Sequence, residues 1–257
     1  MPATDNGHVT LRVTDHIATI SFFHPSQNSL PSALLADMTG KIIQAGNDKD
    51  VHVVVLKSEG DRTYCAGASF DEMLQIKDKQ SGAEFFSGFA RVINACRESS
   101  KIIIGRVQGK AVGGGVGLAA AVDYCMATEA ASIKLSELAI GIGPFVISPA
   151  VSRKVGLQAF TQLTIRATDF QTAAWAKEKG LYNDIYPDIA TLDEAVDALA
   201  QKLASYHPDA LANLKQIFWE GTEDWDELLA ERAAISGELA LSEFTQQALQ
   251  RFKQGGK

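Results

Sequence analysis

The stretch Gly109-Lys110-Ala111-Val112-Gly113-Gly114-Gly115-Val116-Gly117-Leu118-Ala119 follows an apolar run at residues 101–107. Three consecutive glycines before a short apolar segment predict a helix that begins with uncovered backbone amides. Uncovered N–H groups at the start of a helix favour a bound anion or oxyanion. Close packing of a helix against a sheet also requires glycine. The stretch alone therefore leaves a binding site and a packing contact open.

The segments around this stretch alternate between predicted strands and helices. Apolar, β-branched runs predict buried strands at 51–57, 101–107, 124–127 and 132–135, after a hairpin of 8–13 and 17–23. Helical spacing of apolar residues predicts helices over 31–43, 81–98 and 116–122. Residues 58–68, rich in glycine and polar residues, are predicted to be a loop. The recurring strand–strand–helix order predicts an α/β fold with helices covering the sheets.

The second half of the chain is mostly helical. Helices are predicted at 149–156, 157–166 and 172–179, a last strand at 182–186, and then only helices, at 192–206, 208–219 and 225–253. We therefore predict a core of residues 1–190 and a helical region of residues 191–257. This region has more apolar residues than a small tail can bury, so it should pack on another part of the protein or on another subunit. These residues are Leu211, Leu214, Ile217, Phe218, Leu228, Leu229 and Leu239.

The composition excludes several classes of protein. The chain has 257 residues, of which 46% are hydrophobic and 21% charged, with a net charge of −7. These values indicate a globular protein with a sizeable core and disfavour binding to nucleic acid or anionic membranes. Three cysteines without a CxxC pair indicate a reducing compartment. The polar N-terminus and the short apolar runs predict neither a secretory signal nor a membrane span, so we expect a cytoplasmic protein.

Common catalytic signatures are missing from the sequence. The glycine cluster lacks the third glycine of GxGxxG, and the chain contains no GxxxxGK[ST], GxSxG or HExxH. The five histidines are scattered without paired metal-ligand spacing, and surface positions explain those near the N-terminus more simply than a metal site. No metal site is therefore expected.

Two further segments carry candidate chemistry. Residues 64–73 lead from a polar loop into a helix, and their small side chains would let backbone N–H groups approach a ligand, although many such loops bind nothing. In residues 135–145, Glu137 is the one acid among apolar and small residues. Burial would raise its pKa towards values useful for proton transfer. A surface glutamate at the end of a strand is the alternative.

Together these segments resemble the enoyl-CoA hydratase/isomerase (crotonase) superfamily, in order and over nearly the whole chain. The matching segments are His24-Pro25 to Asn28-Ser29-Leu30, the strand Val53–Leu56, the Ala66-Gly67-Ala68 loop, the glycine triplet at 113–115, Ser136-Glu137 and residues 176–181.

This resemblance implies a spiral of repeated ββα units with a C-terminal helical trimerisation region, and a homotrimer or homohexamer. It implies a coenzyme A thioester as the substrate, with no metal and no separate cofactor. The backbone amides of Ala68 and Gly114 would hold the thioester oxygen, at about 3 kcal/mol for each donor. Glu137 would be the acid/base. The substrate-binding residues would be Ala66, Gly67, Ala68, Ser69, Phe70, Gly113, Gly114, Pro144 and Phe145.

The sequence departs from the family at one catalytic position. Typical hydratases carry a second glutamate two residues after the glycine triplet, where this chain has Gly117. Moving a double bond needs only one base, so a single Glu137 favours an isomerase. The residues from 135 to 149 instead resemble methylglutaconyl-CoA hydratases. We therefore expect a hydratase of a branched, methylglutaconyl-like enoyl-CoA, with an isomerase or a non-catalytic CoA-ester-binding homologue as alternatives.

Three smaller expectations follow from the resemblance. If only the second acid is missing, Gly117→Glu should raise hydratase activity. Lys57, Arg62, Arg251 and Lys253 are candidate partners of the CoA phosphates, although solvated surface charge explains each of them as well. The superfamily's roles suggest fatty-acid metabolism or leucine degradation.

Overall fold

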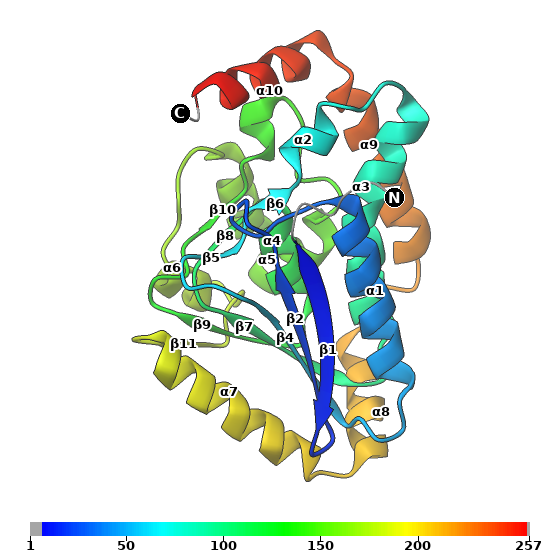
Figure 1. Ribbon diagram of the computed structural model, residues 1–257, viewed down its shortest axis with the longest axis vertical. Coiled ribbons are helices and arrows are strands. Elements are labelled where there is room, and N and C mark those ends of the chain that lie inside the picture. Colours follow the sequence, from blue (N-terminus) through cyan, green and yellow to red (C-terminus); the bar gives the residue numbers. More distant parts are fainter. Residues whose placement is uncertain (1–6, 256–257) are drawn as a thin grey trace.

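The computed structural model describes the backbone of residues 7–255 and the side chains of residues 7–251 (Figure 1). Strands and helices alternate through the first half and helices dominate the second, which confirms the predicted α/β class. The strands are β1 His8–Thr14, β2 Ile17–Phe23, β3 Ser29–Leu30, β4 Val53–Ser58, β5 Thr63–Cys65, β6 Gly67–Ala68, β7 Ile102–Val107, β8 Lys110–Val112, β9 Tyr124–Thr128, β10 Ile133–Lys134 and β11 Asp184–Tyr186. The helices are α1 Ser32–Asn47, α2 Phe70–Met73, α3 Lys79–Glu98, α4 Gly114–Ala121, the 3-10 turn η1 Glu137–Ile140, α5 Ser148–Ile165, α6 Ala173–Glu178, α7 Ile189–Ala204, α8 Pro208–Phe218, α9 Trp225–Ala240 and α10 Glu243–Gly255.

From β4 onward, each strand of the large sheet is followed by one or two short strands that lie outside it, until β11. The large sheet has the order β1-β2-β4-β7-β9-β11 and the small one the order β10-β8-β5, with β3 and β6 as a separate pair. The hairpin β1-β2 is antiparallel, whereas β2, β4, β7, β9 and β11 pair in parallel. After β2, the chain therefore makes one turn of a spiral for each parallel strand that it adds to the large sheet, and parallel pairing needs such crossovers.

The large sheet is covered on both faces, as a parallel sheet of nearly continuous apolar strands requires. Val54, Leu56 and Ile103 point into the main core. Their neighbours Val53, Val55, Ile102 and Ile104 face the opposite side, where they pack against α7. Figure 1 shows α7 running along that lower face of the sheet. A buried Arg106 on β7 ties α7 down through two hydrogen bonds to Asp193, of 2.7 and 3.1 Å.

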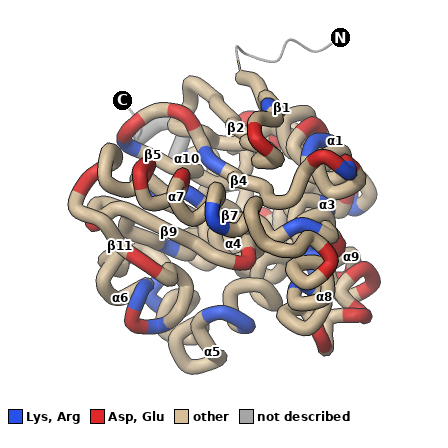
Figure 2. Tube along the Cα trace, turned by 90° about the horizontal axis from the view of Figure 1, so that it is seen from below, with Lys and Arg blue, Asp and Glu red and all other residues tan. Residues whose placement is uncertain are grey.

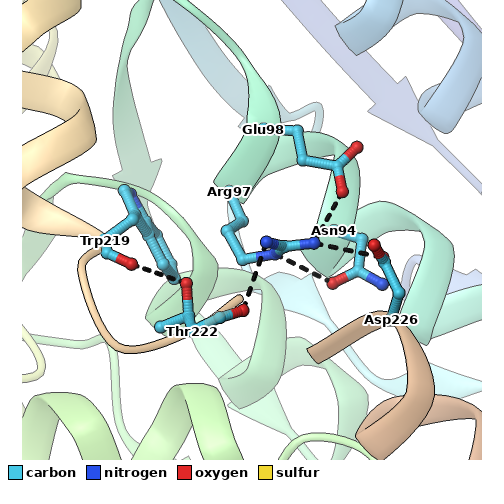
Figure 3. A network of polar contacts seen from close by, with 6 residues as sticks. All are labelled: Asn94, Arg97, Glu98, Trp219, Thr222 and Asp226. Carbon is cyan, nitrogen blue, oxygen red and sulfur yellow. Dashed lines mark hydrogen bonds and ion pairs between the residues drawn. The ribbon is translucent and has the colours of Figure 1, made fainter. Parts of the chain in front are cut away.

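Helix α9 packs along α3, with Gly82 and Gly237 at the closest approach. A Cβ on Gly82 would lie 2.7 Å from the Cα of Gly237, so neither position tolerates a side chain without a shift. Arg97 at the end of α3 donates hydrogen bonds to Thr222 O at 3.2 Å and to Asp226 at 3.1 Å (Figure 3). This contact fixes the start of α9 on the core.

Helix α8 is joined to the core by a buried ion pair. Lys215 on α8 lies 2.6 Å from Asp123, and both side chains are almost fully buried. Asp123 also accepts hydrogen bonds from the Trp219 side chain and from the Ile103 backbone, each at 2.7 Å. Donors from three residues therefore hold one buried carboxylate, which compensates the cost of burying its charge.

The described part of residues 191–257 thus packs mainly on the core of the same chain. This is one of the two alternatives predicted from their apolar side chains, the other being packing on another subunit. The expected boundary between residues 190 and 191 falls in the first turn of α7, which covers the sheet. Leu211 and Leu229 are buried, whereas Leu214, Ile217 and Phe218 on α8 are exposed. Charges of both signs are spread over the molecule in Figure 2.

Two local predictions were wrong. Residues 58–68 are not a plain loop, because β5 and β6 within them pair with β8 and β3. These pairs join distant parts of the chain, and strands of two or three residues leave no period in the sequence. Residues 225–253 form two helices, α9 and α10, because the chain turns at Leu241 and the Ser242 hydroxyl accepts a hydrogen bond from Thr245 N at 3.3 Å.

Candidate active site

A cleft of about 570 Å³, including its open mouth, lies where α2, α3, α4, η1 and the loop before α5 meet. It lies on the side of the molecule where Figure 1 shows α2 and α10. Its lining is apolar apart from the Glu137 side chain and two serines. The lining residues are Ala66, Gly67, Ala68, Phe70, Met73, Phe86, Phe89, Gly113, Gly114, Ser136, Glu137, Ile140, Ile142, Gly143, Pro144, Phe145, Val146, Ile147 and Ser236.

The glycine triplet has a separate structural reason at each position. Gly113 adopts φ +55°, in the region where side chains are strained, and a Cβ there would lie 3.0 Å from the Glu137 carboxylate. A Cβ on Gly114 would overlap the ring of Phe89 at 2.4 Å, and one on Gly115 would lie 2.4 Å from the Cys65 carbonyl oxygen. Packing therefore explains Gly115, whereas Gly113 and Gly114 keep the wall of the cleft open.

Gly114 is the first residue of α4, so its N–H has no acceptor within the helix. The Ala66–Ala68 loop lies against this helix start: a Cβ on Gly67 would be 3.5 Å from Gly114 N. The two segments that were predicted to supply backbone donors are thus neighbours in one cleft, although they are more than forty residues apart.

Cys65 holds the Ala66–Ala68 loop in place through its sulfur atom. Its buried sulfur accepts a hydrogen bond from Gly67 N at 3.4 Å. Burial raises the pKa of the Cys65 thiol to about 12, so this sulfur stays protonated and cannot act as a nucleophile. Ser69 does not line the cleft. Its hydroxyl instead accepts a hydrogen bond from Glu72 N at 3.3 Å and caps α2.

Glu137 reaches the glycine triplet because β10 pairs with β8. Gly113 N donates a hydrogen bond of 2.8 Å to Lys134 O, and η1 begins three residues later at Glu137. The turn ends at Gly141, which has φ +87° and lies against Phe244 and Thr245 of α10. Helix α10 therefore supports the turn that carries the acid.

One oxygen of the Glu137 carboxyl group is shielded from water. The residue as a whole is partly exposed, but its Oε2 atom is buried and has no hydrogen-bond partner among the described residues. Burial raises the pKa of Glu137 from 4.5 to about 7, and a hydrogen bond from its own backbone N–H opposes the shift. A carboxyl group with this pKa can both accept and release a proton near neutral pH.

The space for a second acid is filled. A Cβ on Gly117 would lie 2.3 Å from Cγ2 and 2.8 Å from Cβ of Ile147, the residue before α5. A side chain at position 117 therefore requires Ile147 to shift, and the effect of Gly117→Glu on hydration stays a prediction. Glu137 is the one ionisable side chain among the described lining residues.

The structure brings together all but one of the predicted site residues. Ala66, Gly67, Ala68, Phe70, Gly113, Gly114, Glu137, Pro144 and Phe145 line the cleft, and Ser69 lies outside it. Sequence reasoning missed Phe86 and Phe89, whose helical spacing resembles that of core residues. It also missed Ser236, which lies about a hundred residues away on α9 and has no local signal.

The candidate phosphate partners do not gather at this cleft. Arg62 is exposed and lines a separate hollow beside His24, Asn28 and Glu59. Arg251 is exposed, Lys57 is partly buried on β4, and the Lys253 side chain lies outside the described residues. No group of three or more His, Cys, Asp or Glu among residues 7–251 is placed to hold a metal ion. Within the described chain, no helix is long and apolar enough to cross a bilayer.

Comparison with known proteins gives a family that spans almost the whole chain. Residues 12–255 match the family model described as enoyl-CoA hydratase/isomerase. A short-chain-enoyl-CoA hydratase of Clostridium acetobutylicum is 29% identical over 248 residues, which cover 95% of this chain and 94% of the relative. A 2,3-dehydroadipyl-CoA hydratase of Escherichia coli is 29% identical over 199 residues, which cover 77% and 76%.

Solved structures agree on the fold. The crystal structure of an enoyl-CoA hydratase from Bacillus halodurans superposes with a TM-score of 0.88 at 19% identity and covers 95% of this chain and 99% of that one. At that identity the match establishes the crotonase fold, the spiral that the resemblance implied.

Proposed function

Because the chain belongs to the enoyl-CoA hydratase/isomerase family, we propose that it adds water across the double bond of an α,β-unsaturated acyl-CoA thioester. The observation that carries this proposal is Glu137, whose carboxyl group has one buried, unpartnered oxygen and lies against the glycine triplet in an apolar cleft. The proposed chemistry uses no metal and no cofactor besides the CoA moiety of the substrate.

The thioester oxygen would lie between the N–H groups of Ala68 and Gly114. Support comes from the neighbouring positions of the two segments and from the lack of an intrahelical acceptor for Gly114 N–H. Electrons displaced towards this oxygen during the reaction would form an enolate, which two fixed N–H donors stabilise more strongly than they stabilise the neutral thioester.

One carboxyl group can complete the addition of water. The Glu137 carboxylate takes a proton from water as the water oxygen bonds to C3, and the C2–C3 π electrons move to the thioester oxygen. The enolate then collapses and C2 takes the proton from Glu137. The water molecule is thus divided between C3 and C2, and Glu137 returns to its starting state. A pKa of about 7 suits both proton transfers.

Double-bond isomerisation is the second candidate. The specific observation in its favour is Ile147, which occupies the space beside Gly117 and leaves Glu137 as the one acid in the described lining. A single base can remove a proton from C4 of a 2-enoyl thioester and return it to C2. The apolar cleft accommodates this reaction without a bound water.

Product identification separates the two reactions. The protein is incubated with linear 2-enoyl, linear 3-enoyl and 3-methyl-branched 2-enoyl-CoA esters, and the products are analysed by mass spectrometry and NMR. We expect a mass gain of one water from a 2-enoyl ester. Conversion without a change of mass would replace the hydratase proposal by the isomerase. No conversion of any ester would contradict both.

We also propose a branched acyl group and a homotrimer or homohexamer. Phe145 and Val146 line the cleft. The family resemblance puts them where ordinary hydratases have small residues, so we expect an acyl pocket of different shape. Leu214, Ile217 and Phe218 form an exposed apolar face on α8 that a second subunit could cover. Three buried cysteines without disulfide partners support a cytoplasmic location. Leucine degradation and fatty-acid metabolism stay predictions.

A further inference from the structure

We propose that the acyl group bound in this cleft is uncharged to its far end, so that a substrate with a terminal carboxylate is excluded. This inference rests on the proposed function and specifies its substrate class. It departs from the methylglutaconyl-like ester that the sequence suggested, because that acyl group ends in a carboxylate.

The first argument is the absence of a positive charge. None of the described residues that line the cleft is a lysine, an arginine or a histidine. An ionised carboxylate that leaves water without a cation or a set of hydrogen-bond donors loses several kcal/mol of solvation. A cleft that recognised such a group would need a basic side chain within reach.

The second argument is the apolar lining of the cleft around Glu137. Met73, Ile140 and Ile142 are buried members of one apolar cluster, and Phe86 packs against it. Phe89, whose ring lies against Gly114, and Ile147 belong to the main core. These side chains gain from contact with hydrocarbon and offer a carboxylate no hydrogen bond.

The third argument is the charge of Glu137. It is the one ionisable group of the lining, and its deprotonated form is negative. A second carboxylate in the same low-dielectric cleft would raise the pKa of Glu137 further and reduce the fraction of the reactive base. An uncharged acyl chain leaves this group unchanged.

The two serines of the lining do not replace a cation. The Ser236 hydroxyl donates a hydrogen bond to Arg232 O at 3.1 Å, within α9, so its proton is already used. Ser136 contributes a single neutral hydroxyl at the start of η1. One neutral donor does not balance a buried negative charge.

Arg232 is the residue that could bind a terminal carboxylate if the acyl group carried one. It lies one helical turn before Ser236, outside the lining, and its buried Nε has no hydrogen-bond partner among the described residues. If a carboxylated acyl group reached this guanidinium, it would find the cation that the cleft lacks. The variant Arg232→Met keeps much of the apolar stem and removes the charge, so it tests this route.

The experiment uses esters that differ only at the last carbon. Hexanoyl-CoA and adipyl-CoA, which cannot react, are compared by calorimetry for binding. The unsaturated pairs 2-hexenoyl-CoA with 2,3-dehydroadipyl-CoA, and 3-methyl-2-pentenoyl-CoA with 3-methylglutaconyl-CoA, are compared by kcat/KM. We expect the carboxylated member of each pair to bind or react at least about a hundredfold more weakly. Arg232→Met should leave these ratios unchanged.

The outcomes separate the two proposals. Equal values within each pair, or a preference for carboxylated esters that Arg232→Met abolishes, would overturn the uncharged acyl group and leave the hydratase in place. Preferential binding of hexanoyl-CoA without turnover of any enoyl ester would overturn the hydratase and retain the uncharged pocket.

Discussion

Gly117 and Ile147 together determine how many acids the site can hold. Glycine at 117 has no proton to give, and Ile147 occupies the volume into which a side chain at 117 would extend. The two residues act as a pair. A glutamate at position 117 would supply a carboxyl group but no space for it, and a smaller residue at position 147 would supply the space but no carboxyl group. This pairing distinguishes the site from one with two glutamates, and under the proposed function it leaves all proton transfer to Glu137.

We therefore expect Gly117→Glu to lower the melting temperature without raising hydration, since overpacking costs about 1–3 kcal/mol. The double variant Gly117→Glu/Ile147→Gly should recover stability and gain hydration activity. Thermal unfolding and hydration rates are measured for both, with Ile147→Gly as the control. A single Gly117→Glu variant that is stable and more active would show that Ile147 moves aside freely.

The pH dependence follows from the raised pKa of Glu137, about 7 in the folded protein against 4.5 when exposed. Because the carboxylate starts the reaction, kcat/KM should rise with pH and reach half its maximum near pH 7. The same shift predicts that this group makes folding less favourable as pH rises from 4.5 towards 7, since the unfolded chain loses its proton first. Above that window its effect is constant. A rate profile that is flat across neutral pH would contradict the assignment.

Much of the site was visible in the sequence at this scale. Glu137 stood out as an acid among apolar residues, and the glycine triplet indicated uncovered amides. Ile147 and Ser236 could not be assigned, because their role depends on which side chains meet across the fold. The residues next to Ile147 and Ser236 in the sequence form no pattern that would indicate a position in the cleft.

At the scale of elements, helix α10 packs against η1, the turn that carries the proposed acid/base Glu137. Gly141 ends η1 with φ +87°, and a Cβ there would lie 2.5 Å from the Phe244 ring and 2.6 Å from the Thr245 hydroxyl. The position of Glu137 thus depends on how closely α10 packs.

We expect Gly141→Ala to lower kcat by about tenfold to a hundredfold, because a small displacement of a catalytic group is costly. Gly221→Ala is the matched control: Gly221 also has a positive φ, +76°, but a Cβ there would meet nothing within 4 Å, and the residue lies outside the cleft lining. Both variants should lose some stability from backbone strain. Equal kcat in the two variants would rule out the positioning role of this contact.

The elements themselves were largely predictable. The spacing of apolar residues predicted the helix that starts at Ser32 and the strand that ends at Val107. The glycine at 156, which has φ +76°, marked the break between two predicted helices. The short strands β5 and β6 were not predictable, because they exist only through pairing with distant strands. The division of the last segment into α9 and α10 depended on a serine cap that resembled an ordinary helix residue.

At the scale of the whole molecule, α8 presents an exposed apolar face. Leu214, Ile217 and Phe218 are 44%, 56% and 50% exposed, although the same helix is anchored internally by Lys215. A helix held firmly in place with an apolar outer face suits a subunit interface.

We expect light scattering to give the mass of a trimer or hexamer at working concentration. Ile217→Asp should shift the mass towards smaller species, because it places a charge in the proposed interface. Gln201→Asp, at an exposed polar position on α7, serves as the control and should leave the mass unchanged. A monomeric wild-type protein would exclude the assembly.

The central claim is that Glu137 is the acid/base for an acyl-CoA thioester held in the apolar cleft, and Glu137→Gln tests it most directly. The amide keeps the size of the side chain and removes its ability to transfer a proton. With the best enoyl-CoA ester, we predict a loss of turnover of about 10²–10⁴-fold, with binding of the matching saturated ester unchanged within about twofold. Turnover in the variant equal to that of the wild type would contradict the account.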